Sequence, residues 1–311
     1  MRAATFLLPP RARLPGALPD AVARALGRAD ALPAGEGGER AQLLRHFELL
    51  PRGWPVAALT RQRDAGDAPA HGWLRADPVY ARPDINGVRL LAHGETMRLA
   101  REDAEAFLPA LRPLFGDAGF PIDAPAPTRW YLRLPREARL PAFAEPSEAL
   151  GADLFEHLPE GPEGRRWRVL LSEAQVILHN HPHNAARVAA GKPPVNSLWF
   201  WGGGVLPDHV RTVHAAVHGG EVLLAALAQA AGRDAAPLPA CFAPREGALL
   251  YDLRAARDPA ALAEAWLVPA VEALRRGTLD ALELDFEDGA RFRFAPRQRW
   301  RFWRRPRPAF A

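Results

Sequence analysis

Histidines at alternate positions and a run of three glycines mark the stretch LHNHPHNAARVAAGKPPVNSLWFWGGG, residues 178–204. Imidazole is the commonest metal ligand in proteins, so His179, His181 and His183 suggest a metal site. A glycine run after an apolar strand lets backbone amides approach an anion, which suggests a phosphate site. Which chemistry is feasible depends on the elements that position these residues.

The spacing of nearby residues argues against a three-histidine metal site. Ser172 and Gln175 have capping-box spacing, which predicts a helix beginning at Glu173. Pro182 ends or kinks this helix. Residues two apart on a helix point in different directions, so three alternate histidines would not share one face. We therefore expect no metal and no other cofactor, with manganese or zinc as the alternative.

The glycine run is better placed to bind an anion. NSLWFW predicts a strand that enters Gly202, Gly203 and Gly204. Open α/β sheets bind ligands at the carboxyl ends of their parallel strands. Because neither a following Lys-Ser/Thr nor a spaced G-x-G-x-x-G is present, the run is no nucleotide fingerprint. A tight turn after a bulky strand is the alternative.

Strands and helices alternate along most of the chain. Predicted strands include residues 4–8, 166–171, 247–253 and 279–286, and predicted helices include residues 19–29, 39–50 and 221–231. This alternation predicts an α/β fold with a mostly parallel sheet covered on both faces. Alternating apolar residues on both sides of EDG predict a C-terminal β-hairpin.

Composition restricts the class of protein. Nearly all basic residues are arginine, since Lys192 is the only lysine, and this skew accompanies 32 prolines. Genome base composition explains it better than nucleic-acid recognition does, so we expect no nucleic-acid partner. The single cysteine, Cys241, excludes an intramolecular disulfide. No apolar stretch approaches the roughly 20 residues that cross a bilayer, and we expect a soluble, cytoplasmic protein.

The signature segment carries a resemblance. NHPHNAARVAAGKPPVNSLWFWGGG resembles the "NHPxN…R…G…PPAN…LRGxG" segment of the archaeal-type, cofactor-independent phosphoglycerate mutases of the alkaline-phosphatase superfamily. Over about residues 70–305, the chain also resembles a bacterial group of RpfE-type regulatory proteins related to those mutases. The resemblance implies an alkaline-phosphatase-type sheet with a smaller inserted α/β lobe. Its expected parts are a reduced first piece of the core at 1–70, a β-α-β lobe at 71–140, and the mutase-like core with hairpin and arginine-rich tail at 141–311.

The chain lacks reactive groups that this resemblance implies. Mutases of this family transfer a phosphoryl group through a phosphoserine, assisted by two divalent cations. The serines here are Ser147, Ser172 and Ser197, and the first strand runs into Pro9 and Pro10 instead of a ligand turn. We therefore expect a non-catalytic, regulatory protein without catalytic residues, which binds a small phosphorylated or carboxylated metabolite and an unidentified protein partner.

A candidate ligand site follows from the same resemblance. Its members are polar side chains and backbone amides of the signature segment: His181, Asn184, Arg187, Asn196, Gly202, Gly203 and Gly204. In the structural alternative, Asn184 caps a helix, Arg187 is a surface cation and Asn196 is a turn residue.

Two other functions are open. An active mutase or metal-dependent phosphatase would need other ligands, for which the candidates are Asp208, His209, His214 and His218. An interaction protein would use the tail, where Trp300, Phe302 and Trp303 alternate with arginines. Arginine side chains lying on the face of the last domain explain this tail more simply.

Overall fold

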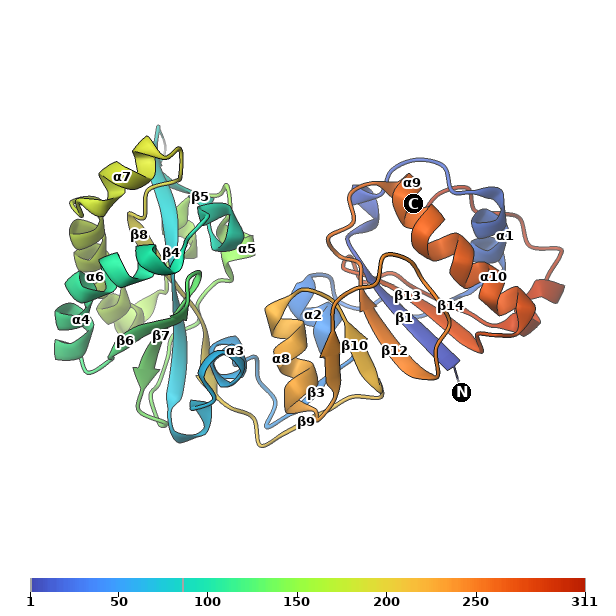
Figure 1. Cartoon of the computed structure of the whole chain (residues 1–311), viewed down its shortest axis with the longest axis horizontal. Helices are drawn as coiled ribbons and strands as arrows, with labels where there is room; N and C mark the ends of the chain where they lie inside the picture. Colours follow the sequence, from blue (N-terminus) through green and yellow to red (C-terminus); the bar gives the residue numbers. More distant parts are fainter. Residues whose placement is uncertain (1, 86, 311) are drawn as a thin grey trace. The chain divides into compact units, whose positions relative to one another are not determined.

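The computed structural model describes residues 2–85 and 87–310 (Figure 1). Within this part of the chain, no helix has the length and apolar character needed to cross a membrane.

Contacts divide the chain into two compact units. The first joins Met1–Arg52 to Asp208–Ala311, and the second, Gly53–Pro207, is inserted between them. The sequence places the inserted lobe at 71–140, so the observed insertion is wider in both directions. A helix before this lobe, and a helix and a strand after it, pack on the lobe's sheet and complete its core.

A seven-stranded sheet forms the centre of the first unit, in the order β11-β10-β12-β1-β13-β14-β2. Its strands are β1 (Arg2–Leu8), β2 (Asp30–Ala31), β10 (Ala216–His218), β11 (Asp234–Ala236), β12 (Gly247–Asp252), β13 (Ala281–Phe286) and β14 (Arg291–Phe294). The four pairings along β11-β10-β12-β1-β13 are parallel. The two remaining pairings, of β14 with β13 and of β14 with β2, are antiparallel. The predicted α/β class with a mostly parallel sheet and the C-terminal hairpin are therefore confirmed.

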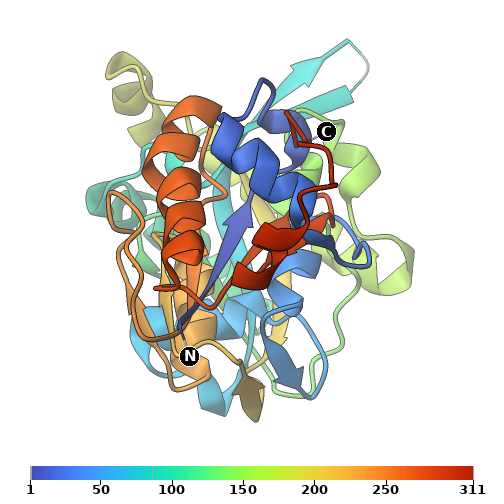
Figure 2. The same cartoon turned by 90° about the vertical axis from the view of Figure 1, so that its right-hand side faces the viewer.

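Helices cover both faces of this sheet (Figures 1 and 2). The helices are α1 (Asp20–Arg28), α9 (Pro259–Leu262) and α10 (Val268–Arg276) on one face, and α2 (Glu39–Leu44) and α8 (Val222–Ala230) on the other. Because both faces are covered, the last five residues of β1 are all buried. Phe6 packs edge-to-face against Tyr251 and Trp266 beneath α10. A separate two-stranded sheet pairs β3 (Glu48–Leu50) with β9 (His209–Arg211).

The inserted unit is built on an antiparallel sheet. Its strands are β4 (Gly72–Asp84), β5 (Gly87–Ala92), β6 (Ile122–Ala126), β7 (Arg129–Leu134) and β8 (Ser197–Val205), and its helices are α3 (Val56–Ala65), α4 (Arg101–Asp117), α5 (Pro146–Ala149), α6 (Gly161–His179) and α7 (His183–Ala189). Successive residues of β4 point to opposite faces of the sheet. Leu74 packs in the core formed with α4 and α6, whereas Trp73 packs against α3 on the other face.

One predicted element is wrong in this unit. Residues 166–171, predicted as a strand, belong to α6, and the capping-box residues Ser172 and Gln175 lie inside that helix. Its buried residues have helical spacing on both sides of Ser172: Trp167, Leu170, Leu171, Ala174 and Leu178. Burial of this continuous apolar stripe determines where the helix begins and ends. The capping-box pattern involves only a few neighbouring residues and does not outweigh that burial.

Candidate functional site

Asn184 of the signature segment joins the end of α6 to the chain that leads into β8. Its side-chain nitrogen donates to the carbonyl oxygens of Leu178 and Val195, each at 2.8 Å. Its Oδ1 accepts from the Val195 amide, also at 2.8 Å. Both ends of the Asn184 amide bind backbone groups of the same chain. Asn184 is therefore not a helix cap, and its side chain is not directed toward a ligand.

Arg187 and His183 meet at Asp103 of α4, a residue that sequence reasoning missed. Arg187 is buried, so it is not a surface cation, and its Nη1 lies 2.6 Å from Asp103 Oδ2. His183 Nε2 lies 2.8 Å from Asp103 Oδ1. Burial alone would raise the pKa of Asp103, but hydrogen bonds from Ala100, His183 and Arg187 hold this pKa below its ordinary value.

Arg187 also fixes the segment that follows α7. Its Nη2 donates to the carbonyl oxygens of Met97 at 2.6 Å and Pro193 at 2.8 Å. Lys192 Nζ lies 4.0 Å from Asp103. Asp103 is therefore the centre of a buried polar cluster that ties α4 to α7.

The other polar residues of the segment also contact their own chain. Asn196 binds the backbone of Ala81 through both ends of its amide, at 2.9 Å and 2.7 Å, and thereby joins β4. The His181 ring lies 4.7 Å from the Phe107 ring between centroids, and its Nδ1 accepts from the His183 amide. A ligand-binding role for His181, Asn196 and the rest of the predicted set stays a prediction.

The three glycines lie inside β8, which is antiparallel to β4, and not in a loop after a parallel strand. Gly202 has a φ of +64°, and a Cβ there would lie 2.8 Å from the Cβ of Val56. A Cβ at Gly204 would lie 2.8 Å from the Cβ of Pro55. The missing side chains therefore let the beginning of α3 pack directly on β8.

We expect Gly202→Ala to lower the free energy of unfolding by about 1–3 kcal/mol, through overpacking against Val56 and a positive φ. Gly66 is the matched control, because its φ is +76° and nothing lies within 4 Å of the Cβ position. Urea unfolding of both variants separates the two causes. Equal losses in both would show that the contact with α3 contributes nothing.

A second polar cluster lies in the first unit, at the carboxyl end of β13. Asp285 is fully buried and binds Arg45 through both oxygens, Oδ1 to Nη2 at 2.6 Å and Oδ2 to Nε at 2.9 Å. His46 Nε2 lies 3.0 Å from Asp285 Oδ2. Burial would raise the pKa of Asp285, but the hydrogen bonds from Arg45 and His46 keep this pKa below its ordinary value.

The cluster continues to a buried histidine. His46 Nδ1 lies 3.2 Å from His214 Nε2, and among the described residues no hydrogen-bond partner meets His214 Nδ1. Burial, followed by the neighbouring His46, lowers the pKa of His214 to about 3. His214 is therefore a neutral imidazole in the folded protein at physiological pH.

This lowered pKa makes stability depend on pH. The unfolded chain protonates His214 near its ordinary pKa of 6.5, whereas the folded protein resists protonation until about pH 3. The stability that His214 contributes is complete above pH 6.5 and falls toward pH 3, at up to about 1.4 kcal/mol per pH unit.

We expect His214→Asn to flatten the loss of stability between pH 6.5 and 4.5, as measured by urea unfolding at several pH values. His209→Asn is the control, because His209 is exposed. Parallel stability curves for the wild type and His214→Asn would contradict this assignment.

A matching pair lies on the other side of β1. Asp252 ends β12 and binds Arg254 through both oxygens, each at 2.8 Å. Arg254 also binds Glu39 of α2 at 2.7 Å. In the sheet register, Leu7 of β1 is level with both Asp252 and Asp285. Two arginine-bound aspartates therefore flank the central strand at its carboxyl end.

The alternative metal ligands have different surroundings. Asp208 and His209 are exposed, His214 lies against His46, and His218 stacks on the ring of Tyr251 at 5.0 Å. In residues 2–85 and 87–310, no group of three or more His, Cys, Asp or Glu side chains could hold a metal ion.

Comparison with known proteins yields partial matches. No family model matches the chain. A 62-residue segment is 40% identical to the "Probable 2,3-bisphosphoglycerate-independent phosphoglycerate mutase" of Geobacter sulfurreducens, and covers 20% of this chain and 16% of that protein. The 2,3-bisphosphoglycerate-independent phosphoglycerate mutase of Methanosarcina mazei is 39% identical over 62 residues, with the same coverage. The match therefore spans about a sixth of the length of these relatives.

Two solved structures align with most of the chain. The cofactor-independent phosphoglycerate mutase from Thermoplasma acidophilum covers 94% of this chain and 89% of its own, with a TM-score of 0.42 and 15% identity. The PH0037 protein from Pyrococcus horikoshii covers 94% and 87%, with a TM-score of 0.47 and 11% identity. The segment matches establish that this chain is related in sequence to the cofactor-independent phosphoglycerate mutases over about a fifth of its length.

Proposed function

We propose that this chain is a non-catalytic, regulatory relative of the cofactor-independent phosphoglycerate mutases in the alkaline-phosphatase superfamily, of the RpfE type. The observation that supports this proposal most strongly is the pair of arginine-bound aspartates beside β1. Asp252 and Asp285 lie at the carboxyl end of the parallel sheet, where α/β folds bind their substrates. Both carboxylates are already neutralised by guanidinium groups.

The donors at this end of the sheet do not fit the two divalent cations that the resemblance implies. Each aspartate uses both oxygens on a guanidinium, so a fixed positive charge lies beside each of the two carboxylates and disfavours a cation there. No serine precedes Ser147 in the sequence, which leaves the N-terminal part of the unit without a serine nucleophile. Phosphoryl transfer depends on such charge neutralisation and positioning of the nucleophile.

An activity assay tests the proposal directly. The purified chain is assayed for interconversion of 2- and 3-phosphoglycerate and for hydrolysis of p-nitrophenyl phosphate, with and without added Mn²⁺, beside an active mutase. We expect no turnover above the protein-free background under any condition. Turnover that depends on Mn²⁺ and is lost in Asp285→Asn would refute the proposal.

For the regulatory part, we propose a small phosphorylated or carboxylated metabolite as the ligand, together with an unidentified protein partner. Because Asn184, Arg187 and Asn196 bind their own chain, the partly exposed His181 is the predicted side chain best able to reach such a ligand. We expect 3-phosphoglycerate to raise the melting temperature of the wild type and not that of His181→Ala. No shift in the wild type would remove this metabolite from consideration.

A further inference from the structure

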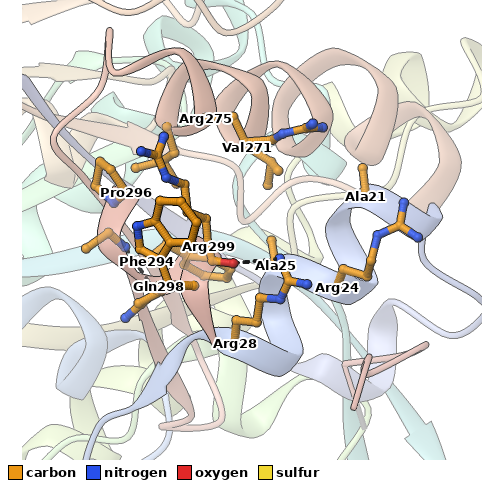
Figure 3. Close-up of a pocket in the computed structure, with 13 residues that line it drawn as sticks. Ala21, Arg24, Ala25, Arg28, Val271, Arg275, Phe294, Pro296, Gln298 and Arg299 are labelled. Carbon is orange, nitrogen blue, oxygen red and sulfur yellow. Dashed lines mark hydrogen bonds between the residues drawn. The ribbon is translucent and has the colours of Figure 1, made fainter. Parts of the chain in front are cut away.

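A pocket lined by arginine lies in the first unit, between α1, α10 and the C-terminal segment (Figure 3). Its volume is about 500 Å³, which is within the range of small-ligand sites. Four arginines border it from three elements: Arg24, Arg28, Arg275 and Arg299. None of the residues that line it is acidic.

The charges of these arginines are only partly compensated. Arg24 pairs with the exposed Asp20 at the edge of the pocket. Arg28 Nη1 donates to the carbonyl oxygen of Arg299 at 3.2 Å, while its buried Nε has no hydrogen-bond partner among the described residues. All four arginines border the same pocket, so a multiply charged anion that enters it is attracted by several positive groups at once.

The C-terminal side of the pocket contributes apolar residues beside Gln298 and Arg299. It is formed by β14 and the helical turn η6 (Pro296–Trp300), with Phe294, Pro296 and the exposed Trp300 among its residues. Gln298 fixes this side, because its side-chain nitrogen donates to Asp30 at 2.9 Å. The guanidinium of Arg299 lies 5.0 Å from the centre of the Trp300 ring. Trp300 is largely exposed, so a planar ligand has access to the indole.

The pocket is separate from the aspartate pairs beside β1. Phe294 at the end of β14 pairs with Leu282 at the beginning of β13, whereas Asp285 pairs with Arg291 at the other end. α10 likewise ends at Arg276, before β13 begins. The arginine pocket therefore lies toward the amino ends of the parallel strands, opposite the end that bears Asp285.

We propose that this pocket binds a nucleoside polyphosphate, with the phosphates on Arg24, Arg28, Arg275 and Arg299 and the base stacked on Trp300. The anionic charge of the phosphates matches the arginines, and the base matches the flat indole of Trp300. The volume of about 500 Å³ matches a single nucleotide. This inference does not depend on whether the chain is catalytic.

Fluorescence titration with mant-ADP and mant-GDP, followed by competition, tests the inference. We expect saturable binding that weakens at least about tenfold in Arg28→Gln and in Arg275→Gln, which lose charged hydrogen bonds. Trp300→Ala should weaken binding about fivefold or more, through lost stacking. Arg276→Gln is the matched control, since Arg276 adjoins Arg275 but pairs with Glu272 and does not line the pocket.

Each alternative has its own outcome. No saturable binding of either mant-nucleotide to the well-folded wild type would overturn the proposal. Inorganic triphosphate that competes equally well in the wild type and Trp300→Ala would overturn the base-stacking part. A single-stranded oligonucleotide that binds far more tightly than the nucleotides would reassign the pocket to nucleic acid. Because Arg28 and Arg275 lie on different helices, the loss of fold in one variant leaves the other as a test.

Discussion

Replacing Arg187 with methionine is expected to lower the free energy of unfolding of the inserted unit by about 3–5 kcal/mol. The change leaves the carboxylate of Asp103 buried without its closest cation, and it also removes donors to Met97 and Pro193. The hydrogen bonds from Ala100 and His183 remain, so Asp103 is not wholly without donors. The methionine side chain retains the apolar stem, which confines the loss to polar contacts.

Tryptophan fluorescence during urea unfolding is a suitable measurement, because six of the nine tryptophans lie within residues 53–207. Arg101→Met is the matched control. Arg101 precedes Asp103 on α4 but is exposed and pairs only along the helix surface with Glu105, so its loss should cost less than about 0.5 kcal/mol.

A double variant distinguishes a broken ion pair from lost packing. In Asp103→Asn, Arg187→Met, the buried negative charge is removed together with its partner, so part of the stability should return. If Arg187→Met and Arg101→Met have equal, small effects, the buried cluster at Asp103 does not hold α4 and α7 together.

The parallel sheet and the hairpin could be predicted because they follow from local apolar runs. The strands at 4–8, 247–253 and 279–286 have the uninterrupted or alternating apolar pattern that burial in a sheet requires, and all three are present. α6 could not be placed from Ser172 and Gln175, since its boundaries depend on burial against α4 and β8. A short cap pattern occurs by chance within a long helix.

The candidate site could likewise be predicted in part, since the aspartates follow from local patterns and one of their arginine partners does not. Asp252 and Asp285 stand at the ends of correctly predicted strands, and that position was a usable signal, because parallel strands present their carboxyl ends at one edge. Their arginine partners differ. Arg254 is only two residues from Asp252, but Arg45 is 240 residues from Asp285, a distance that no local pattern spans.

The position of the glycine run inside β8 could not be predicted, for a physical reason. Glycine permits both a close approach to an anion and a close approach to another backbone, and the sequence alone does not say which. The atoms of Val56 and Pro55 at the missing Cβ positions of Gly202 and Gly204 identify the second case.

Replacing Arg45 with methionine should lower the free energy of unfolding of the first unit by about 3–5 kcal/mol. Asp285 is fully buried, and Arg45 supplies two of the three side-chain hydrogen bonds to its oxygens, the third being with His46. Removing Arg45 leaves a buried carboxylate whose remaining side-chain contact is one imidazole. Arg40→Met is the matched control, because Arg40 lies on α2, the helix that Arg45 caps at its C-terminus, and is exposed.

Hydrogen exchange in β13 and urea unfolding followed by circular dichroism provide the measurements, since β13 carries Asp285 and lies beside the central strand β1. Asp285→Asn should cost less in the Arg45→Met background than in the wild type, with a coupling of at least about 1 kcal/mol. Additive effects would mean that Arg45 and Asp285 stabilise the fold independently. The guanidinium would then not be what neutralises this aspartate, and the strongest support for a non-catalytic protein would be lost.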